Sequence, residues 1–327
     1  MRDQFGRKIE YMRISLTDRC NLRCIYCMPE EETEQIDTEN VLEYDEIIRV
    51  CKIAAKLGIS KIKLTGGEPL VRKDIEVLIK RLKNLEGIKQ VTLTTNGVLL
   101  KEKMQQLYEA GLDAVNISLD TLDRKQYAQI TKRDQLSKVL EGIECAMQYT
   151  GLKVKINCVA LAGCNEKQWV PIVEFAKNYS IDVRFIERMP IGTKESFNIA
   201  LQEEIQKCLD SAFGCSHKEE NIQRGNGPAK YWSYPNFQGK IGFISAISHK
   251  FCEDCNRIRM TSEGYIKPCL QFSEGIDLRT LLRGDVGDDK IQEALEKVIY
   301  QKPRCHIFEQ EKKEGHLEKH QMSWIGG

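Results

Sequence analysis

Two groups of three cysteines are the residues of this sequence whose type and spacing could do chemistry. One group forms a C-x3-C-x2-C motif and the other a C-x2-C-x13-C motif: they are Cys20, Cys24 and Cys27, and Cys252, Cys255 and Cys269. Thiolates bind zinc or iron–sulfur clusters, and both kinds of centre normally take four ligands. Each group is therefore one ligand short of a complete site.

The first group leaves three interpretations open. Three thiolates in one loop can hold structural zinc with a fourth ligand from elsewhere, or a [4Fe–4S] cluster whose last iron stays open to a small chelating molecule. Buried, reduced cysteines without metal are the plain alternative. The polar neighbours Asp18, Arg19 and Asn21 argue against it, because free buried cysteines behave as small apolar residues.

The second group has a possible fourth protein ligand and two nearby arginines. His249 lies three residues before Cys252 and would complete a zinc site, whereas a second [4Fe–4S] cluster would keep one iron open. Arg257 and Arg259 alternate along an extended segment, so their guanidinium groups lie on one side. Such a pair suits a polyphosphate, although on a surface strand it would be solvated charge.

The composition of the chain indicates which partners and which cell compartment are compatible with such centres. The 327 residues carry 49 Lys+Arg against 48 Asp+Glu, which argues against a general electrostatic grip on nucleic acid or on an acidic membrane. No apolar run is long enough to span a bilayer and no signal peptide is visible, so we expect a cytoplasmic protein with reduced thiols. The other cysteines show no paired spacing and are expected to be packing residues: Cys51, Cys145, Cys158, Cys164, Cys208, Cys215 and Cys305.

Alternating strand and helix patterns must position these residues. Strands are expected at Tyr11–Thr17, Lys61–Thr65, Gln90–Thr95, Ala114–Leu119, Val154–Ala160 and Val183–Ile186. Helices are expected at Asp45–Leu57, Asp74–Leu85, Lys101–Ala110, Leu136–Tyr149 and Glu166–Tyr179. This alternation predicts an α/β fold with a parallel sheet and outer helices. Six βα units are fewer than a closed barrel needs, so we expect a partial barrel with its ligands at the C-terminal strand ends.

The pattern changes after about residue 190. A helix is expected at Leu201–Phe213, short strands at Lys240–Ser245 and Gly264–Lys267, and a helix at Lys290–Tyr300. We therefore predict a barrel domain over residues 1–235 and a smaller C-terminal domain over residues 236–327.

The run C-N-L-R-C-I-Y-C at Cys20–Cys27 and the run T-G-G-E-P at Thr65–Pro69 resemble the hallmark motifs of the radical S-adenosylmethionine (SAM) superfamily. The resemblance implies a partial (β/α)6 TIM-like barrel. It also implies that the first cysteine group holds a [4Fe–4S] cluster whose open iron binds SAM, and that one electron then cleaves SAM to a 5′-deoxyadenosyl radical. The residues that it assigns to SAM are Tyr26, Gly67, Glu68, Ser118 and Met189.

Further motifs resemble the GTP 3′,8-cyclase family (molybdenum cofactor biosynthesis protein A) from end to end: R-x-S-x-T-D-R-C-N, T-T-N-G, N-x-S-L-D, K-x-N, R-F-I-E-x-M-P, F-C-E-D-C-N-R-I-R and the terminal I-G-G. The resemblance implies a C-terminal iron–sulfur domain whose second [4Fe–4S] cluster holds guanine. The residues that it assigns to GTP are Arg13, Lys63, Thr94, Lys155, Arg257, Ile258 and Arg259, and it assigns a catalytic role to Gly326 and Gly327. This family usually has Arg where this chain has Lys63.

The implied reaction is a lyase reaction that rearranges 5′-GTP to (8S)-3′,8-cyclo-7,8-dihydroguanosine 5′-triphosphate, the first step of molybdenum cofactor biosynthesis. The resemblance also implies a homodimer, a reductant such as flavodoxin or ferredoxin, and transfer of the product to cyclic pyranopterin monophosphate synthase. No nucleic acid or membrane partner is expected.

Two alternatives remain at this point. Another radical SAM enzyme with an auxiliary cluster, of the peptide-modifying type, would usually carry more cysteines in its C-terminal region and lack the Gly-Gly end. A zinc-stabilised module that binds RNA or protein is disfavoured by the near-zero net charge and by the barrel pattern.

Overall fold

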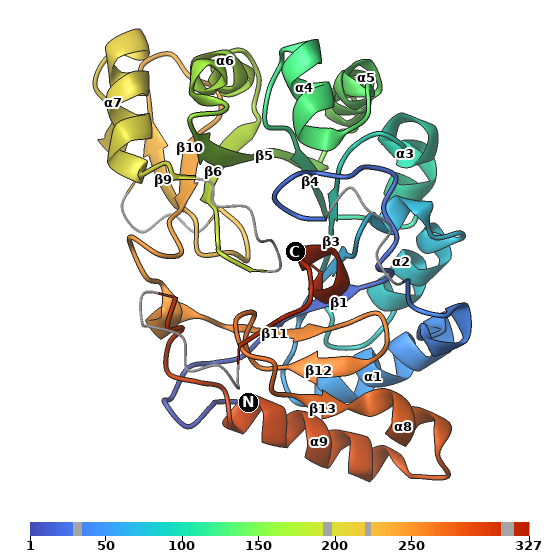
Figure 1. Cartoon of the computed structure of the whole chain (residues 1–327). Coiled ribbons are helices and arrows are strands. Elements are labelled where there is room, and N and C mark those ends of the chain that lie inside the picture. The colour runs from blue at the N-terminus through green and yellow to red at the C-terminus, as the bar shows by residue number, and fades with distance from the viewer. Residues whose placement is uncertain (29–34, 192–197, 220–223, 309–316, 327) are drawn as a thin grey trace.

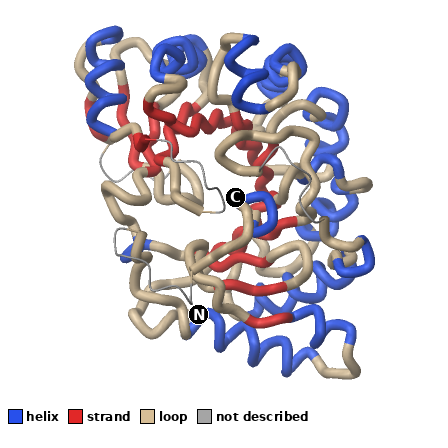
Figure 2. Tube along the Cα trace, viewed as in Figure 1, coloured by secondary structure: helices blue, strands red, loops and turns tan. Residues whose placement is uncertain are grey.

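The structure is a computed structural model, and it describes residues 1–28, 35–191, 198–219, 224–308 and 317–326. Within these residues one large sheet curves around the C-terminus, and helices cover its outer face (Figure 1). The tube view shows the strands as a continuous arc with the helices outside it (Figure 2). The strand order is β13-β12-β11-β1-β2-β3-β4-β5-β6-β10-β9-β8, and β7 pairs with β5 off this path.

Six adjacent parallel strands form the centre of the sheet and confirm the predicted strands. They are β1 (Tyr11–Ser15), β2 (Lys61–Thr65), β3 (Gln90–Thr95), β4 (Ala114–Ser118), β5 (Lys153–Ala162) and β6 (Asp182–Glu187). The side chains alternate between the two faces, as the pleat requires. In β1, Met12 and Ile14 are fully buried in the apolar core, whereas Arg13 between them faces the inside of the arc.

The helices lie outside the strands and bury their apolar faces against the sheet. The predicted ones are present as α1 (Tyr44–Lys56), α2 (Ile75–Lys83), α3 (Leu100–Glu109), α5 (Leu136–Met147), α6 (Trp169–Asn178), α7 (Gln202–Phe213) and α9 (Asp288–Tyr300). Apart from the four-residue helix α10 (Met322–Ile325), two more were not predicted: α4 (Arg124–Thr131) and α8 (Leu278–Arg283). Both are short, so their sequences hold too few apolar repeats to reveal a helical period. Each begins at an Asp, Asp123 or Asp277, whose carboxylate caps the first turn.

The C-terminal part of the chain extends both ends of the barrel sheet. Strand β11 (Arg257–Met260) pairs in parallel with β1, and β10 (Ile241–Ile244) pairs in parallel with β6. Beyond them lie β12 (Tyr265–Lys267), β13 (Ile276–Asp277), β9 (Lys230–Ser233) and β8 (His217–Lys218). The sheet therefore runs across the predicted boundary at residue 235, and that boundary remains a prediction.

Short elements complete the described chain. They are the strand β7 (Asn198–Ile199), the helix α10 (Met322–Ile325) and the 3-10 turns η1 (Thr38–Asn40), η2 (Pro69–Val71), η3 (Glu166–Gln168) and η4 (Cys252–Asp254). None of the helices in the described ranges combines the length and the apolar character that a membrane span requires.

We expect that a fragment of residues 1–235 will not fold into a monodisperse protein. Removing β10 and β11 would leave β6 and β1 with unpaired backbone groups, and such edges template aggregation. Size-exclusion chromatography of the fragment beside the full chain measures this. A monodisperse fragment with an unchanged circular dichroism signal per residue would contradict the expectation.

Candidate functional site

Both cysteine groups line one cavity inside the arc of the sheet, although they lie far apart in the sequence. The cavity has a volume of about 350 Å³ and runs along the inside of the arc, from the first residues of the parallel strands to their C-terminal ends. The first group follows β1, and the second lies just before and after the β11–β12 hairpin. Chain folding therefore places two potential metal centres around a shared space.

Polar side chains from every central strand face this cavity. Each strand contributes at least one such side chain. In the order β1 to β6, they include Arg13, Lys63, Thr94, Asn116, Lys155 and Arg184. The strand register places Arg13 beside Lys63 on one side and beside Arg259 on the other. It also places Asn116 beside Thr94 and Lys155. The inside of the barrel is thus a polar ligand site, and the apolar core lies between the sheet and its helices.

Two glycines hold the T-G-G-E-P turn against the first cysteine loop. The Gly67 N–H donates to the Thr17 carbonyl (2.7 Å), and the Glu68 N–H donates to the Arg19 carbonyl (2.8 Å). A Cβ atom on Gly67 would lie 2.3 Å from the Arg19 oxygen, and one on Gly66 would lie 2.6 Å from the Thr17 oxygen. The sequence suggests that these glycines admit a ligand, and the structure shows that they admit the neighbouring backbone.

Glu68 joins the same turn to the end of β3. Its carboxylate accepts hydrogen bonds from the Thr95 hydroxyl (2.7 Å), the Leu70 N–H (3.0 Å) and the Asn96 N–H (2.7 Å). Burial raises its pKa to about 7, although these donors favour the charged form. A carboxylate has about four acceptor sites, so one remains for the contact with SAM that the resemblance assigns to Glu68, which stays a prediction.

The surroundings of the first group disfavour free thiolates and are compatible with thiols that lose their protons when a metal binds. Burial raises the pKa of Cys20 to about 11 and that of Cys27 to about 12, and it raises the pKa of Cys24 well above its usual value. Neighbouring thiols of the group add to the shifts of Cys24 and Cys27. A bound metal favours the thiolate form and would reverse these shifts. The residues therefore fit a cluster that binds with release of protons.

Tyr26 connects this loop to the end of β4. Its hydroxyl donates to Asp120 (2.5 Å), and the other carboxylate oxygen of Asp120 accepts from the Val159 N–H (2.8 Å). Burial raises the pKa of Asp120 to about 6, against the effect of these two hydrogen bonds. Tyr26 thus aligns the loop with two strand ends.

The second group has an asymmetric electrostatic environment. Burial alone would raise the pKa of Cys255, but the positive charges of Arg257 and Lys302 outweigh it and lower the pKa to about 6. Burial raises the pKa of Cys252. His249 does not line the cavity, and its ring contacts Glu203 (2.7 Å) on α7 instead, so the predicted zinc-completing role has no support.

No three histidine, cysteine or carboxylate side chains in the described ranges are arranged to hold a single metal ion. A [4Fe–4S] cluster spreads its cysteine ligands over separate iron atoms, so three cysteines around one wall of a cavity match the cluster interpretation.

Positive charges gather between the two groups. Burial lowers the pKa of Lys63 far below its usual value, and the charges of Arg184, Arg13, Lys155 and Arg257 lower it further. Burial, Arg13 and Arg257 similarly lower the pKa of Arg259. Lys155 differs because its ammonium donates to Asp182 (2.8 Å) and to the Tyr231 hydroxyl (3.1 Å). A cluster of this kind is stabilised by a polyanion.

The structure brings most of the predicted ligand residues to this cavity. Its lining includes the residues assigned to SAM, which are Tyr26, Gly67, Glu68, Ser118 and Met189, and those assigned to GTP, which are Arg13, Lys63, Thr94, Lys155, Arg257 and Arg259. The side chain of Ile258 is fully buried in the core and does not reach it. Gly326 lies against Ser15 and Thr65 at the ends of β1 and β2, and Gly327 is outside the described residues.

Sequence reasoning missed Arg184, Asn116 and Lys302 in this lining. Arg184 donates to the Asn116 side chain (2.6 Å), and both are buried. The sequence did offer one signal for Arg184, because it is a charged residue inside the apolar run Val183–Ile186. The packing prediction for the other cysteines is wrong for Cys215 and Cys305, which are exposed, whereas Cys51 and Cys158 are buried in the core.

Family models match most of the chain. A model of the radical SAM superfamily matches residues 14–176, and one described as Molybdenum Cofactor Synthesis C matches residues 181–308. The chain is 45% identical over 327 residues to a Clostridium perfringens (strain SM101) protein named GTP 3′,8-cyclase, with 100% of both chains covered. It is 42% identical over 335 residues, again with full coverage of both, to an Alkaliphilus oremlandii protein of the same name.

The fold is similar to that of a distant solved structure, the Streptococcus suis protein SuiB. The TM-score is 0.60 at 17% identity, and the match covers 90% of this chain and 66% of SuiB. At this identity the likeness supports the fold alone, and it agrees with the predicted partial barrel.

We expect Gly67→Ala to abolish the first metal centre and leave the second. The added Cβ would overlap the Arg19 carbonyl and force the cysteine loop away from the end of β2. Iron per chain after anaerobic reconstitution should fall by about half. Gly287→Ala is the matched control, because nothing lies within 4 Å of a Cβ at that position. Unchanged iron in the Gly67 variant would contradict this account.

We also expect Cys255 to react first in metal-free protein. Because its pKa is about 6, the thiolate predominates above that pH, whereas Cys252, with a raised pKa, stays protonated. Alkylation by iodoacetamide, followed by peptide mass analysis, should show a half-maximal rate at Cys255 near pH 6. Arg257→Gln should move this midpoint upward, and an unchanged midpoint would exclude the proposed cause.

Proposed function

This chain belongs to the GTP 3′,8-cyclase family of the radical SAM superfamily, and on that premise we propose that it converts 5′-GTP to (8S)-3′,8-cyclo-7,8-dihydroguanosine 5′-triphosphate. This reaction is the first step of molybdenum cofactor biosynthesis. One observation carries the proposal: two groups of three cysteines lie around one cavity, and a cluster of buried cations lies between them.

The residues at the first group fit SAM and its [4Fe–4S] cluster. When bound, this pair supplies the one-electron chemistry that starts the reaction. Cys20, Cys24 and Cys27 would hold the cluster, and the carboxylate of Glu68 retains an acceptor site for an ammonium group. Ser118 and Met189 line the same cavity, at the end of β4 and just after the end of β6.

The residues at the second group fit GTP. Cys252, Cys255 and Cys269 would hold the second [4Fe–4S] cluster, whose open iron suits the guanine. Arg13, Lys63 and Arg259 stand side by side in the strand register and would bind the triphosphate. Arg184 donates a hydrogen bond to the side chain of Asn116. These two residues would orient the ribose between the two centres. The chain's task is to hold C3′ and C8 in place and to exclude water.

The peptide-modifying alternative is less well supported. SuiB has been solved with a bound precursor peptide, SuiA, and it shares the fold. That likeness is at 17% identity, whereas the GTP 3′,8-cyclase relatives match this chain over its full length at up to 45%. Buried cations at the cavity also suit a triphosphate better than a peptide.

We further propose a reaction class, a location and partners for this protein. The reaction would class the protein as a lyase acting in the cytoplasm, as a homodimer that takes electrons from a flavodoxin or ferredoxin. Its product would pass to cyclic pyranopterin monophosphate synthase.

Anaerobic incubation with GTP, SAM and dithionite tests the function. We expect 5′-deoxyadenosine and an isomer of GTP, identified as a chromatographically separate species of the same mass as GTP and by its conversion to a pterin. The reconstituted protein should be brown, with about eight irons per chain. A colourless protein that binds zinc, or cleavage of SAM without a GTP isomer, would overturn the proposal.

Lys63→Ala should weaken GTP binding more than it slows turnover. Losing one charge-assisted phosphate contact should raise the KM for GTP about tenfold and lower kcat by less than about threefold. Lys61→Ala is the matched control, because Lys61 lies on the same strand but pairs with Glu10 outside the cavity. A fall in kcat as large as the rise in the KM for GTP, or no change in either, would contradict the role of Lys63.

A further inference from the structure

We propose that Glu263 is a positioning residue for the C-terminal segment, here residues 317–326. The inference deepens the proposed function, on which it rests, because this segment reaches the cavity that would hold SAM and GTP. Glu263 lies on the turn between β11 and β12. Its side chain is partly buried and connects the segment to two other parts of the chain.

The end of the C-terminal segment lies deep in the molecule. Gly326 has a positive φ of 73°, and its carbonyl accepts a hydrogen bond from the Arg259 guanidinium (3.0 Å). A Cβ there would lie 2.9 Å from the Thr65 side chain and 3.0 Å from that of Ser15. The Ser323 N–H donates to the Cys27 thiol. The segment therefore touches both the first cysteine loop and the cation cluster, and a small displacement would break these contacts.

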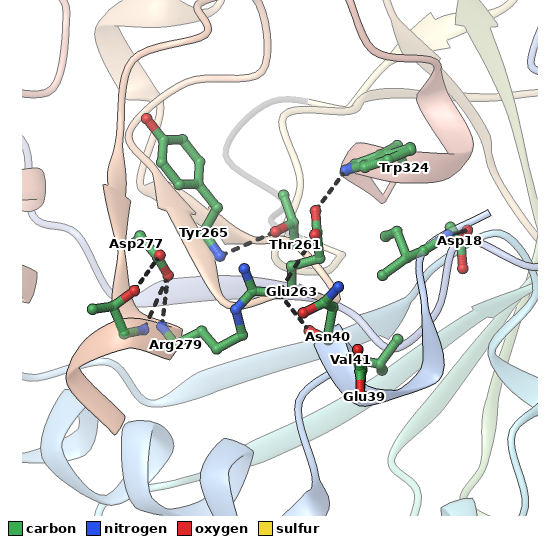
Figure 3. A network of polar contacts seen from close by, with 12 residues as sticks. Asp18, Glu39, Asn40, Val41, Thr261, Glu263, Tyr265, Asp277, Arg279 and Trp324 are labelled. Carbon is green, nitrogen blue, oxygen red and sulfur yellow. Dashed lines mark hydrogen bonds and ion pairs between the residues drawn. The ribbon is translucent and has the colours of Figure 1, made fainter. Parts of the chain in front are cut away.

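One carboxylate fixes this placement from the side. The indole N–H of Trp324 donates to one oxygen of Glu263 (3.2 Å), and the guanidinium of Arg279 lies 3.6 Å from the other. Figure 3 shows Glu263 between Trp324 and Arg279 in this way. Each oxygen thus has its own partner, and the two partners belong to different elements, α10 and α8.

The network continues to the loop that follows the first cysteine group. Arg279 donates to the Asn40 carbonyl (3.1 Å) in η1 (Figure 3). The same loop is tied back to the cysteine motif, because the Ile36 N–H donates to Asp18 (2.8 Å). Glu263 therefore links the C-terminal segment to the backbone that carries the first cysteines.

Two other contacts hold the start of the segment rather than its end. Glu318 forms a buried ion pair with Lys267, and Leu317 forms a backbone bridge with Phe272. Near the end, Met322, Trp324 and Ile325 pack with Ile191 and Leu270 in a small apolar cluster. Apolar packing has little directional preference, so the orientation of α10 depends on its hydrogen bonds, and the one from Trp324 to Glu263 is the bond that connects it to α8 through Arg279.

Hydrogen exchange of the anaerobic, reconstituted full chain tests the placement without using activity. The amides of Trp324 and Ile325 donate to the Gln321 carbonyl and report on the docked helix. Glu263→Ala should speed their exchange about tenfold, while Glu263→Gln, which keeps an acceptor for the indole, should stay near wild type. Glu293→Ala, an exposed carboxylate on α9, is the matched control.

Trp324→Phe removes only the indole donor and should reproduce the Glu263→Ala result, with no added effect in the double variant. Unchanged exchange in Glu263→Ala would overturn the proposal. An equal increase of amide exchange in α9 of the Glu263→Ala variant would also overturn it, as would a matching fall in the thermal stability of that variant. Either result would indicate general destabilisation instead of positioning.

Activity supplies a second readout. Glu263→Ala should lower kcat about tenfold and change the KM for GTP by less than about twofold, because the segment is expected to act after GTP has bound. Glu263→Gln should restore most of kcat, and loss of GTP affinity would count against positioning. If the wild-type chain forms no GTP isomer, the proposed function fails, whereas the exchange experiment still decides the role of Glu263.

Discussion

The parallel pairing of β1 with β11 is the contact on which the rest of the site depends. It places Arg13 beside Arg259 and Tyr11 beside Arg257. The loop after β1 carries the first cysteine group, and β11 begins two residues after Cys255, so this one pairing brings both groups to the same cavity. Closing such a long loop costs chain entropy, which the ladder and the buried Met12 and Ile258 offset.

The same pairing concentrates charge that the ligand-free protein tolerates at a cost. Lys63 and Arg259 are buried among other cations, and burial disfavours their charged forms. A site that binds a triphosphate reverses this penalty, since the ligand supplies the missing negative charge. The unfavourable burial of these cations in the free protein therefore favours the binding of a polyanion.

Close backbone contacts fix how the loops around the cavity fit together. Gly67 admits the Arg19 carbonyl, and Gly326 fits between Ser15 and Thr65, in both cases where a Cβ would overlap. The T-G-G-E-P turn, the cysteine loop and the C-terminal segment therefore meet around the ends of β1 and β2. A shift in any one of them would move the first metal centre. Hydrogen bonds accepted by Glu68 and Glu263 and donated by Tyr26 hold the region in place.

The sequence by itself determined the local features. The cysteine spacings, the T-G-G-E-P turn and the six strands were predictable, because ligands within one loop and side chains that alternate along one strand are set by neighbouring residues. The short helices α4 and α8 carry too few apolar repeats and were missed. Only the tertiary structure decided that Arg184 faces the cavity, that His249 turns away to Glu203, and that Trp324 meets Glu263. These outcomes depend on the curvature of the sheet and on strand pairing across the chain, and no local periodicity encodes contacts between segments that far apart.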